Sequence, residues 1–126
     1  MQLTIKNNSI KEPSHASGSI GNALQLNIGT NTGNTNYVCA DISSNDIAGG
    51  GNNVNFGEED FRLRQRQSTT IRLPGYSGPA TDLTLTPPAV VAFVKGQNTG
   101  SPTGSATVSG SGGGFVGGAA CTLPSP

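Results

Sequence analysis

Several residue types are scarce in this sequence. Tryptophan is absent, methionine occurs only at position 1, and charged residues make up 11% of the 126 positions, against about 25% in an ordinary protein. No apolar run approaches the roughly 18 residues of a transmembrane helix. Ala, Glu, Lys and Leu are too few for a helical bundle or a coiled coil. The net charge of zero disfavours an ordinary nucleic-acid-binding protein.

The abundant residues are small and polar. Gly, Ser, Thr, Asn and Pro account for 65 of the 126 residues. Hydrophobic residues reach 33%, which is enough for a thin β core but not for a deep one. A thin core and a net charge of zero are typical of a subunit that is stabilised by assembly, because concentrated free monomers normally carry net charge. We therefore expect a component of an assembly.

Alternating apolar and polar residues predict a series of short strands. The alternation occurs at residues 3–5, 24–28, 37–42, 61–66, 70–73 and 83–85. A continuous apolar run at residues 89–94 predicts a central strand that is buried on both faces. No segment keeps a helical period over ten residues. The sequence therefore predicts an all-β fold, a small sandwich or barrel of about seven to nine short strands with an extended Gly-rich C-terminal arm.

The composition changes in the last third of the chain. We assign residues 1–95 to a β-domain and residues 96–126 to a Gly/Ser/Thr-rich arm that packs on the domain or on a neighbouring subunit. The arm is either a flexible tail or a hairpin of two Gly-rich strands. Its large apolar side chains are candidates for a protein interface: Val108, Phe115 and Val116.

Residues that could carry catalysis or bind metal are few. The single histidine, His15, lies in a Pro- and Ser-containing loop, and no nucleophile motif accompanies it. The adjacent carboxylates at 58–60 are read as balancing the nearby arginines. Asp41 and Asp46 with the carbonyls of residues 49–51 match no known calcium loop, and the ligands for zinc are too few. We predict a non-enzymatic protein without a catalytic residue, metal or cofactor.

Two cysteines, Cys39 and Cys121, lie 82 positions apart. A bond between them would tie the tail to the third predicted strand. Without a signal peptide two reduced thiols are the default state. If the protein leaves the cell on lysis, it meets oxidant, and a disulfide can then form. The sequence leaves three states open: reduced thiols, a bond within the chain, or a bond between subunits.

Four of the seven basic residues lie within eleven positions. Arg62, Arg64 and Arg66 fall on one face of a predicted strand, and Arg72 would join them across a hairpin that turns near Gln67. Planar guanidinium groups suit bidentate pairing with a carboxylate-rich protein surface. Two other interpretations remain, a solvated face that nearby carboxylates neutralise and a nucleic-acid contact, the latter without interleaved aromatic residues.

The start of the chain, residues 1–6, alternates polar and apolar residues and has no secretory signal, so we expect a cytosolic origin. With its short strands and its Gly-rich end at residues 96–126, the chain resembles capsid decoration (cement) proteins of tailed bacteriophages. The resemblance implies a β-domain that sits on the outside of an icosahedral shell, often as a trimer, binds major capsid proteins and carries no chemistry. We therefore favour a homo-oligomer with three subunits, and we expect no nucleic-acid and no membrane partner. Its location would be the virion, after synthesis in the host cytoplasm.

Three alternatives stay open. Another minor virion role, in the tail or in head completion, fits almost as well. A self-assembling subunit of an extracellular filament or surface layer would grow by strand addition. A carbohydrate-binding sandwich would use Tyr37 or Tyr76 as a stacking platform.

Overall fold

The computed structural model describes residues 1–11, 22–29, 35–48, 59–79, 88–109 and 112–122. Within them the chain forms nine strands and one short helix, which confirms the predicted all-β fold of about seven to nine strands. The elements follow in the order β1 (Gln2–Lys6), β2 (Ser9–Lys11), β3 (Leu24–Ile28), β4 (Asn36–Ser43), β5 (Asp46–Ala48), β6 (Phe61–Arg66), β7 (Thr69–Pro74), α1 (Pro88–Gly96), β8 (Gly104–Ser109) and β9 (Gly114–Gly118).

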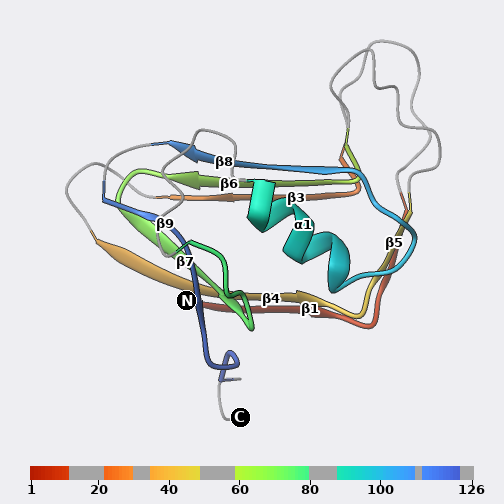
Figure 1. Cartoon of the computed structure of the whole chain (residues 1–126), viewed down its shortest axis with the longest axis horizontal. Coiled ribbons are helices and arrows are strands. Elements are labelled where there is room, and N and C mark those ends of the chain that lie inside the picture. The colour runs from red at the N-terminus through yellow and green to blue at the C-terminus, as the bar shows by residue number, and fades with distance from the viewer. Residues whose placement is uncertain (12–21, 30–34, 49–58, 80–87, 110–111, 123–126) are drawn as a thin grey trace.

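Every strand pair in the described ranges is parallel. Sheet A holds its strands in the order β1-β4-β7-β9, sheet B in the order β2-β5, and sheet C in the order β3-β6-β8. The chain visits sheets A, B and C in turn and then returns to sheet A one strand further along. This winding is that of a parallel β-solenoid, in which each coil stacks on the one before. Sheets A and C face each other across the core, and sheet B lies at one side (Figure 1).

Consecutive strands always belong to different sheets, so none of the described strands forms a hairpin with the next one. The predicted hairpin near Gln67 is wrong, because β6 belongs to sheet C and β7 to sheet A. Gln67 has a φ of 57°, the left-handed conformation that turns the chain from one sheet into the other. The predicted Gly-rich strands at residues 106–108 and 115–116 do form, as β8 and β9. They do not pair with each other, since β8 extends sheet C beside β6 and β9 extends sheet A beside β7.

Inward-facing side chains stack in rows from coil to coil. In sheet C, Leu24 lies beside Phe61, and Phe61 lies beside Gly104. The ring of Phe61 is completely buried, and a Cβ atom on Gly104 would collide with it. Glycine at this position therefore makes room for the largest side chain of the row. The same alternation of large and small side chains fills the interior with a single apolar cluster.

A ladder of asparagines marks the corner between sheets A and B. The side-chain oxygen of Asn45 accepts hydrogen bonds from the backbone and side-chain nitrogens of Asn8, both at 3.1 Å. One coil further, the side-chain oxygen of Asn98 accepts from the corresponding nitrogens of Asn45, at 3.0 and 2.9 Å. The side-chain nitrogens of Asn45 and Asn98 also donate to the carbonyls of Ile5 and Ile42. The ladder satisfies backbone groups that the tight corner leaves without a strand partner.

The predicted central strand at residues 89–94 is wrong, because this segment forms the helix α1. Pro88 stands at its first position, where the missing N–H costs nothing, and Lys95 lies in the last turn. Val90 and Val94, four residues apart, share the face that packs into the core. The run of valines favours a strand by local preference. The spacing of the buried pair and the terminal signals fit a helix instead.

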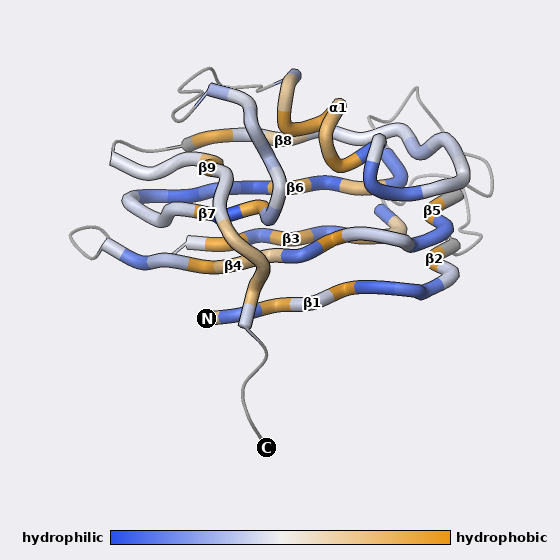
Figure 2. Tube along the Cα trace, turned by 60° about the horizontal axis from the view of Figure 1, so that its bottom comes forward, coloured by the Kyte–Doolittle hydropathy of each residue, from blue (hydrophilic) through white to orange (hydrophobic). Residues whose placement is uncertain are grey.

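Helix α1 covers one end of the stack, beside β8, whereas β1 and the N-terminus lie at the other end (Figure 2). No helix within the described residues is long and apolar enough to span a membrane. The expected strand at residues 83–85 lies outside the described residues. The parts of the predicted arm that are described, residues 96–109 and 112–122, contain β8 and β9 and thus complete sheets C and A.

Candidate functional site

The outer face of sheet C carries the row of arginines that the sequence predicts on one strand face. Arg62, Arg64 and Arg66 alternate along β6 with residues that are completely or almost completely buried. Two-residue spacing on a strand places successive guanidinium stems roughly 6.5 to 7 Å apart. Gln25 and Asn27 of β3 lie beside Arg62 and Arg64 on one side. On the other side the arginines have the β8 residues Ser105, Thr107 and Ser109 as their neighbours in register.

Two nearby carboxylates accept hydrogen bonds from residues of β8 and of the segment before it. Asp60, at the corner before β6, is buried, and its carboxylate accepts from the backbone N–H of Thr103 at 2.6 Å and from its hydroxyl at 3.1 Å. The carboxylate of Glu59 accepts from the hydroxyl of Ser105. Glu58 lies outside the described residues.

Within the described ranges the one ion pair joins Lys6 to Asp41, at 2.7 Å on sheet A. None of the three arginines of β6 therefore has a carboxylate partner in that part of the chain. The Nε atom of Arg62 is buried without a hydrogen-bond partner. We call Arg62, Arg64 and Arg66 the arginine row.

Arg72 does not join the arginine row. It lies on β7, on the outer face of sheet A, beside Cys39 of β4 and Val116 of β9. Together with Tyr37 and Met1 these residues line an open hollow of about 420 Å³. The sequence grouped Arg72 with the row because it assumed a hairpin, and the corner at Gln67 sends the two strands into different sheets.

Two of the three predicted interface residues of the arm belong to the core. Val108 and Phe115 are 3% and 0% exposed, so their predicted role in a protein interface is wrong. The cause is the regular pleat of β8 and β9, which turns these two side chains inward. Val116 is half-buried and faces outward into the hollow on sheet A.

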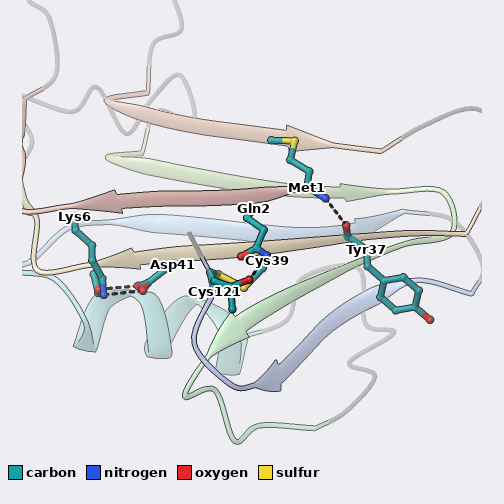
Figure 3. Close-up of a disulfide and its surroundings, with 9 residues drawn as sticks. Met1, Gln2, Lys6, Tyr37, Cys39, Asp41 and Cys121 are labelled. Atoms are coloured by element: carbon teal, nitrogen blue, oxygen red, sulfur yellow. Dashed lines mark hydrogen bonds and ion pairs between the residues drawn. A yellow bond between two sulfur atoms is a disulfide. The ribbon is translucent and has the colours of Figure 1, made fainter. Parts of the chain in front are cut away.

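A disulfide joins Cys39 to Cys121, with a Cα–Cα distance of 5.6 Å (Figure 3). After β9 the chain runs back across the outer face of sheet A toward β1 (Figure 2). Gly118 lies against Arg72 of β7, Cys121 bonds to β4, and the hydroxyl of Thr122 accepts a hydrogen bond from the side chain of Gln2 in β1. The tail thus contacts three coils in turn, and we call residues 118–122 the clasp.

The remaining candidates do not form a site. Asp41 pairs with Lys6, and in the described part of the chain no three His, Cys, Asp or Glu side chains gather closely enough to hold a metal ion. His15 and residues 49–51 lie outside the described residues. Tyr76 is buried and meets Phe93 edge to face, with ring centroids 5.4 Å apart, whereas Tyr37 is 70% exposed.

Sequence reasoning missed the asparagine ladder. Its signal is a repeat, because Ile5-x-x-Asn8-x-Ile10 recurs as Ile42-x-x-Asn45-x-Ile47. The asparagines of the two copies are 37 positions apart. Each of them follows a residue in the left-handed conformation, which makes the corner. A recurrence at this period is the sequence signature of stacked coils.

No protein-family model, curated protein or solved structure matches this chain. Its function is therefore argued from the arginine row, the clasp and the ends of the stack.

Proposed function

We propose that this chain is a structural, non-enzymatic protein of a virion, which binds the outside of an icosahedral shell and stabilises the joints between major capsid proteins. The arginine row is the observation that supports the proposal. Three guanidinium groups at regular spacing on one pleated sheet face, without a carboxylate partner in the described residues, suit a surface with carboxylates at similar spacing. Such a surface is a protein, because no aromatic side chain lies beside Arg62 or Arg64 on β3 or β8 to stack nucleic-acid bases.

The scaffold supports the same role. A parallel solenoid holds β6 between β3 and β8, so the spacing of the arginine row is fixed by two neighbouring strands. The clasp fastens the first, second and third coils of sheet A together on the opposite face. A rigid face loses little conformational entropy on binding, which favours a protein whose task is to add contact area.

The virion role is tested by asking whether the protein is found on virus particles. Lysates of the cells that carry the sequence are separated on a density gradient, and the chain is measured by mass spectrometry in the band that contains particles. We expect it to band with the particles and to be removed by high salt, because exposed charge pairs are screened. A chain that stays at the top of the gradient at low salt would refute the virion role.

The arginine row is tested in the same gradient. Changing Arg62, Arg64 and Arg66 to Ala should lower the affinity for the particle roughly tenfold or more, since each exposed charge pair contributes up to about 1 kcal/mol. The matched control changes Gln25 and Asn27 to Ala on the neighbouring strand of the same face. Equal particle binding by the arginine variant and the control would show that the row is a solvated face.

The second candidate is a self-assembling subunit of an extracellular filament or surface layer. The uncovered edges of β1 and β3 at one end of the stack favour it, because an open parallel edge is a template for strand addition. Helix α1 at the other end opposes it, since repeated head-to-tail addition needs both ends free. Open-ended growth of the solution mass with concentration would favour the filament over the virion protein.

A further inference from the structure

The two ends of the solenoid differ in how the core is covered. At the end formed by the last coils, α1 places Val90 and Val94 over the interior, and both are buried. At the end formed by the first coil, Leu3 and Ile5 of β1 face the core but remain half-buried. Their neighbours Ala40 and Ile42, one strand further along sheet A, are 1% and 4% exposed. Among the described residues, the first coil therefore lacks the cover that the last coils have.

Sheet C shows the same contrast. The inward side chains of β3 are only partly buried, namely Leu24, Leu26 and Ile28. Their neighbours in β6, Phe61 and Leu63, are 0% and 2% exposed.

An open hollow of about 300 Å³ reaches the interior near the first coil, and Met1, Ile28 and Val38 are among the residues that line it. The free edges of β1 and β3 and the apolar side chains between them thus lie at the same end of the stack, and no other part of the described chain covers them.

We propose that the first coil binds the first coil of a second copy of this chain, head to head about a twofold axis. The axis runs from sheet A to sheet C, perpendicular to both. It makes β1 pair with β1 of the partner, and β3 with β3 of the partner, in antiparallel orientation. Sheets A and C then continue from one subunit into the other, and the two cores join.

The sequence of β1 suits such pairing with itself. A twofold axis at Thr4, the middle of the five residues, sets Thr4 opposite the partner's Thr4 on the outer face. Leu3 then lies opposite the partner's Ile5 on the core face, and Gln2 lies opposite the partner's Lys6. Apolar residues meet apolar residues, and no like charges face each other, so every cross-strand pair is favourable or neutral. Each strand edge also gains the backbone partners that it lacks.

The sequence of β3 has the same property. An axis at Leu26 sets this residue opposite the partner's Leu26 and Leu24 opposite the partner's Ile28, all on the core face. Gln25 then lies opposite the partner's Asn27 on the outer face, and both are uncharged amides. Because β1 and β3 face each other across the core and each has five residues, one axis relates both pairs (Figure 1).

This arrangement closes at two subunits. The interface uses the same surface on both copies, and helix α1 covers the far end of each. The expected assembly is therefore a dimer, in place of the trimer that the resemblance favoured and of an open filament. The two arginine rows come to lie on one face of the dimer, separated by β3 and the partner's β3. Three strand spacings place them about 14 Å apart.

The experiment measures the solution mass of the full oxidised chain by light scattering behind a sizing column, over a range of concentrations. The chain itself should have twice the mass of one subunit. Thr4→Lys should give the mass of one subunit at concentrations where the unchanged chain is dimeric, because it puts two ammonium groups opposite each other at the axis. We expect the dissociation constant to rise roughly tenfold or more. Within the subunit the new lysine lies beside Asp41, which preserves folding.

Complementary charges distinguish the proposed axis from a general loss of stability. Thr4→Glu alone should also be monomeric, whereas an equimolar mixture of the Lys and Glu variants should recover the dimer. Thr107→Glu, on the outer face of the edge strand at the other end, is the matched control, because it also places a new charge beside an opposite one, that of Arg64, and it should remain dimeric. A monomeric unchanged chain, a trimer, a polymer that grows with concentration, or a dimer that survives Thr4→Lys would each overturn the proposal. None of these measurements involves particles, so failure here is separate from failure of the virion role.

Discussion

The asparagine ladder supports a quantitative prediction for Asn45→Ala. The side chain of Asn45 is completely buried and bridges three coils. It accepts from two nitrogens of Asn8 and donates to the carbonyl of Ile5 and to the side chain of Asn98, at 2.9 Å in both cases. Alanine at this position would leave the backbone N–H of Asn8 and the carbonyl of Ile5 without their partners. The oxygen of Asn98 would keep the backbone N–H of residue 45.

The magnitude follows from these two backbone groups. A buried polar group that loses its partner costs about 1–3 kcal/mol. Two such groups would cost about 2–6 kcal/mol, and we expect about 3 kcal/mol because Asn8 is exposed and water can reach its side of the corner. That is a large part of the roughly 5–15 kcal/mol by which a domain is stable.

The assay is urea unfolding followed by far-ultraviolet circular dichroism, with Asn8→Ala as the control. Asn8 takes part in the same ladder but lies at its exposed end, so water replaces its lost hydrogen bonds and the loss should be about 1 kcal/mol. The midpoint should shift far more for Asn45→Ala than for Asn8→Ala, with an unchanged slope. If the two variants lose equal stability, the ladder does not hold the coils together and the reasoning is refuted.

Two further predictions concern the packing of the core and the clasp. Gly104→Ala should lower the free energy of unfolding by about 1–3 kcal/mol, because the added methyl group overlaps the ring of Phe61; an unchanged urea midpoint would contradict this packing. Cys121→Ser should lower it by up to about 4 kcal/mol, since the disulfide closes a loop of 82 residues. Adding reductant should lower the melting temperature of the unchanged chain to that of the serine variant and should not affect the variant. If reductant changes neither melting temperature, the disulfide does not contribute to stability.

The sequence predicts where most of the longer strands lie but misses the short strands β2 and β5, mistakes the helix α1 for a strand, and does not show which strands pair. Alternation along a strand is set by its two faces, so residues 61–66 and 70–73 could be recognised without knowledge of the sheet. Pairing depends on contacts between distant residues, such as Gln25 with Arg62. A hairpin turn and a solenoid corner use similar residues, which is why the sequence predicts a hairpin near Gln67 and allows one in the Gly-rich arm. The repeated Ile-x-x-Asn-x-Ile was the one local sign of stacking.

The candidate site was predictable to a similar extent. Arg62, Arg64 and Arg66 share a face because of the strand period alone, and the structure keeps them together. Arg72 lies in another sheet, because its position relative to the other three arginines depends on the corner at Gln67 and not on the two-residue period of a strand. The burial of Phe115 was not predictable for a related reason. A Gly-rich segment gives no local indication that it completes sheet A, which is what turns this side chain into the core.

The clasp changes how tension passes through the molecule. When the chain is pulled at its two ends, the force runs through residues 1–39 to Cys39, crosses the disulfide to Cys121 and bypasses residues 40–120. The sections outside the bond can extend to roughly 150 Å, compared with roughly 440 Å for the whole chain without it. The strands β5 to β9, the helix and the arginine row thus lie inside a covalent loop that a pull on the termini does not extend while the bond is intact.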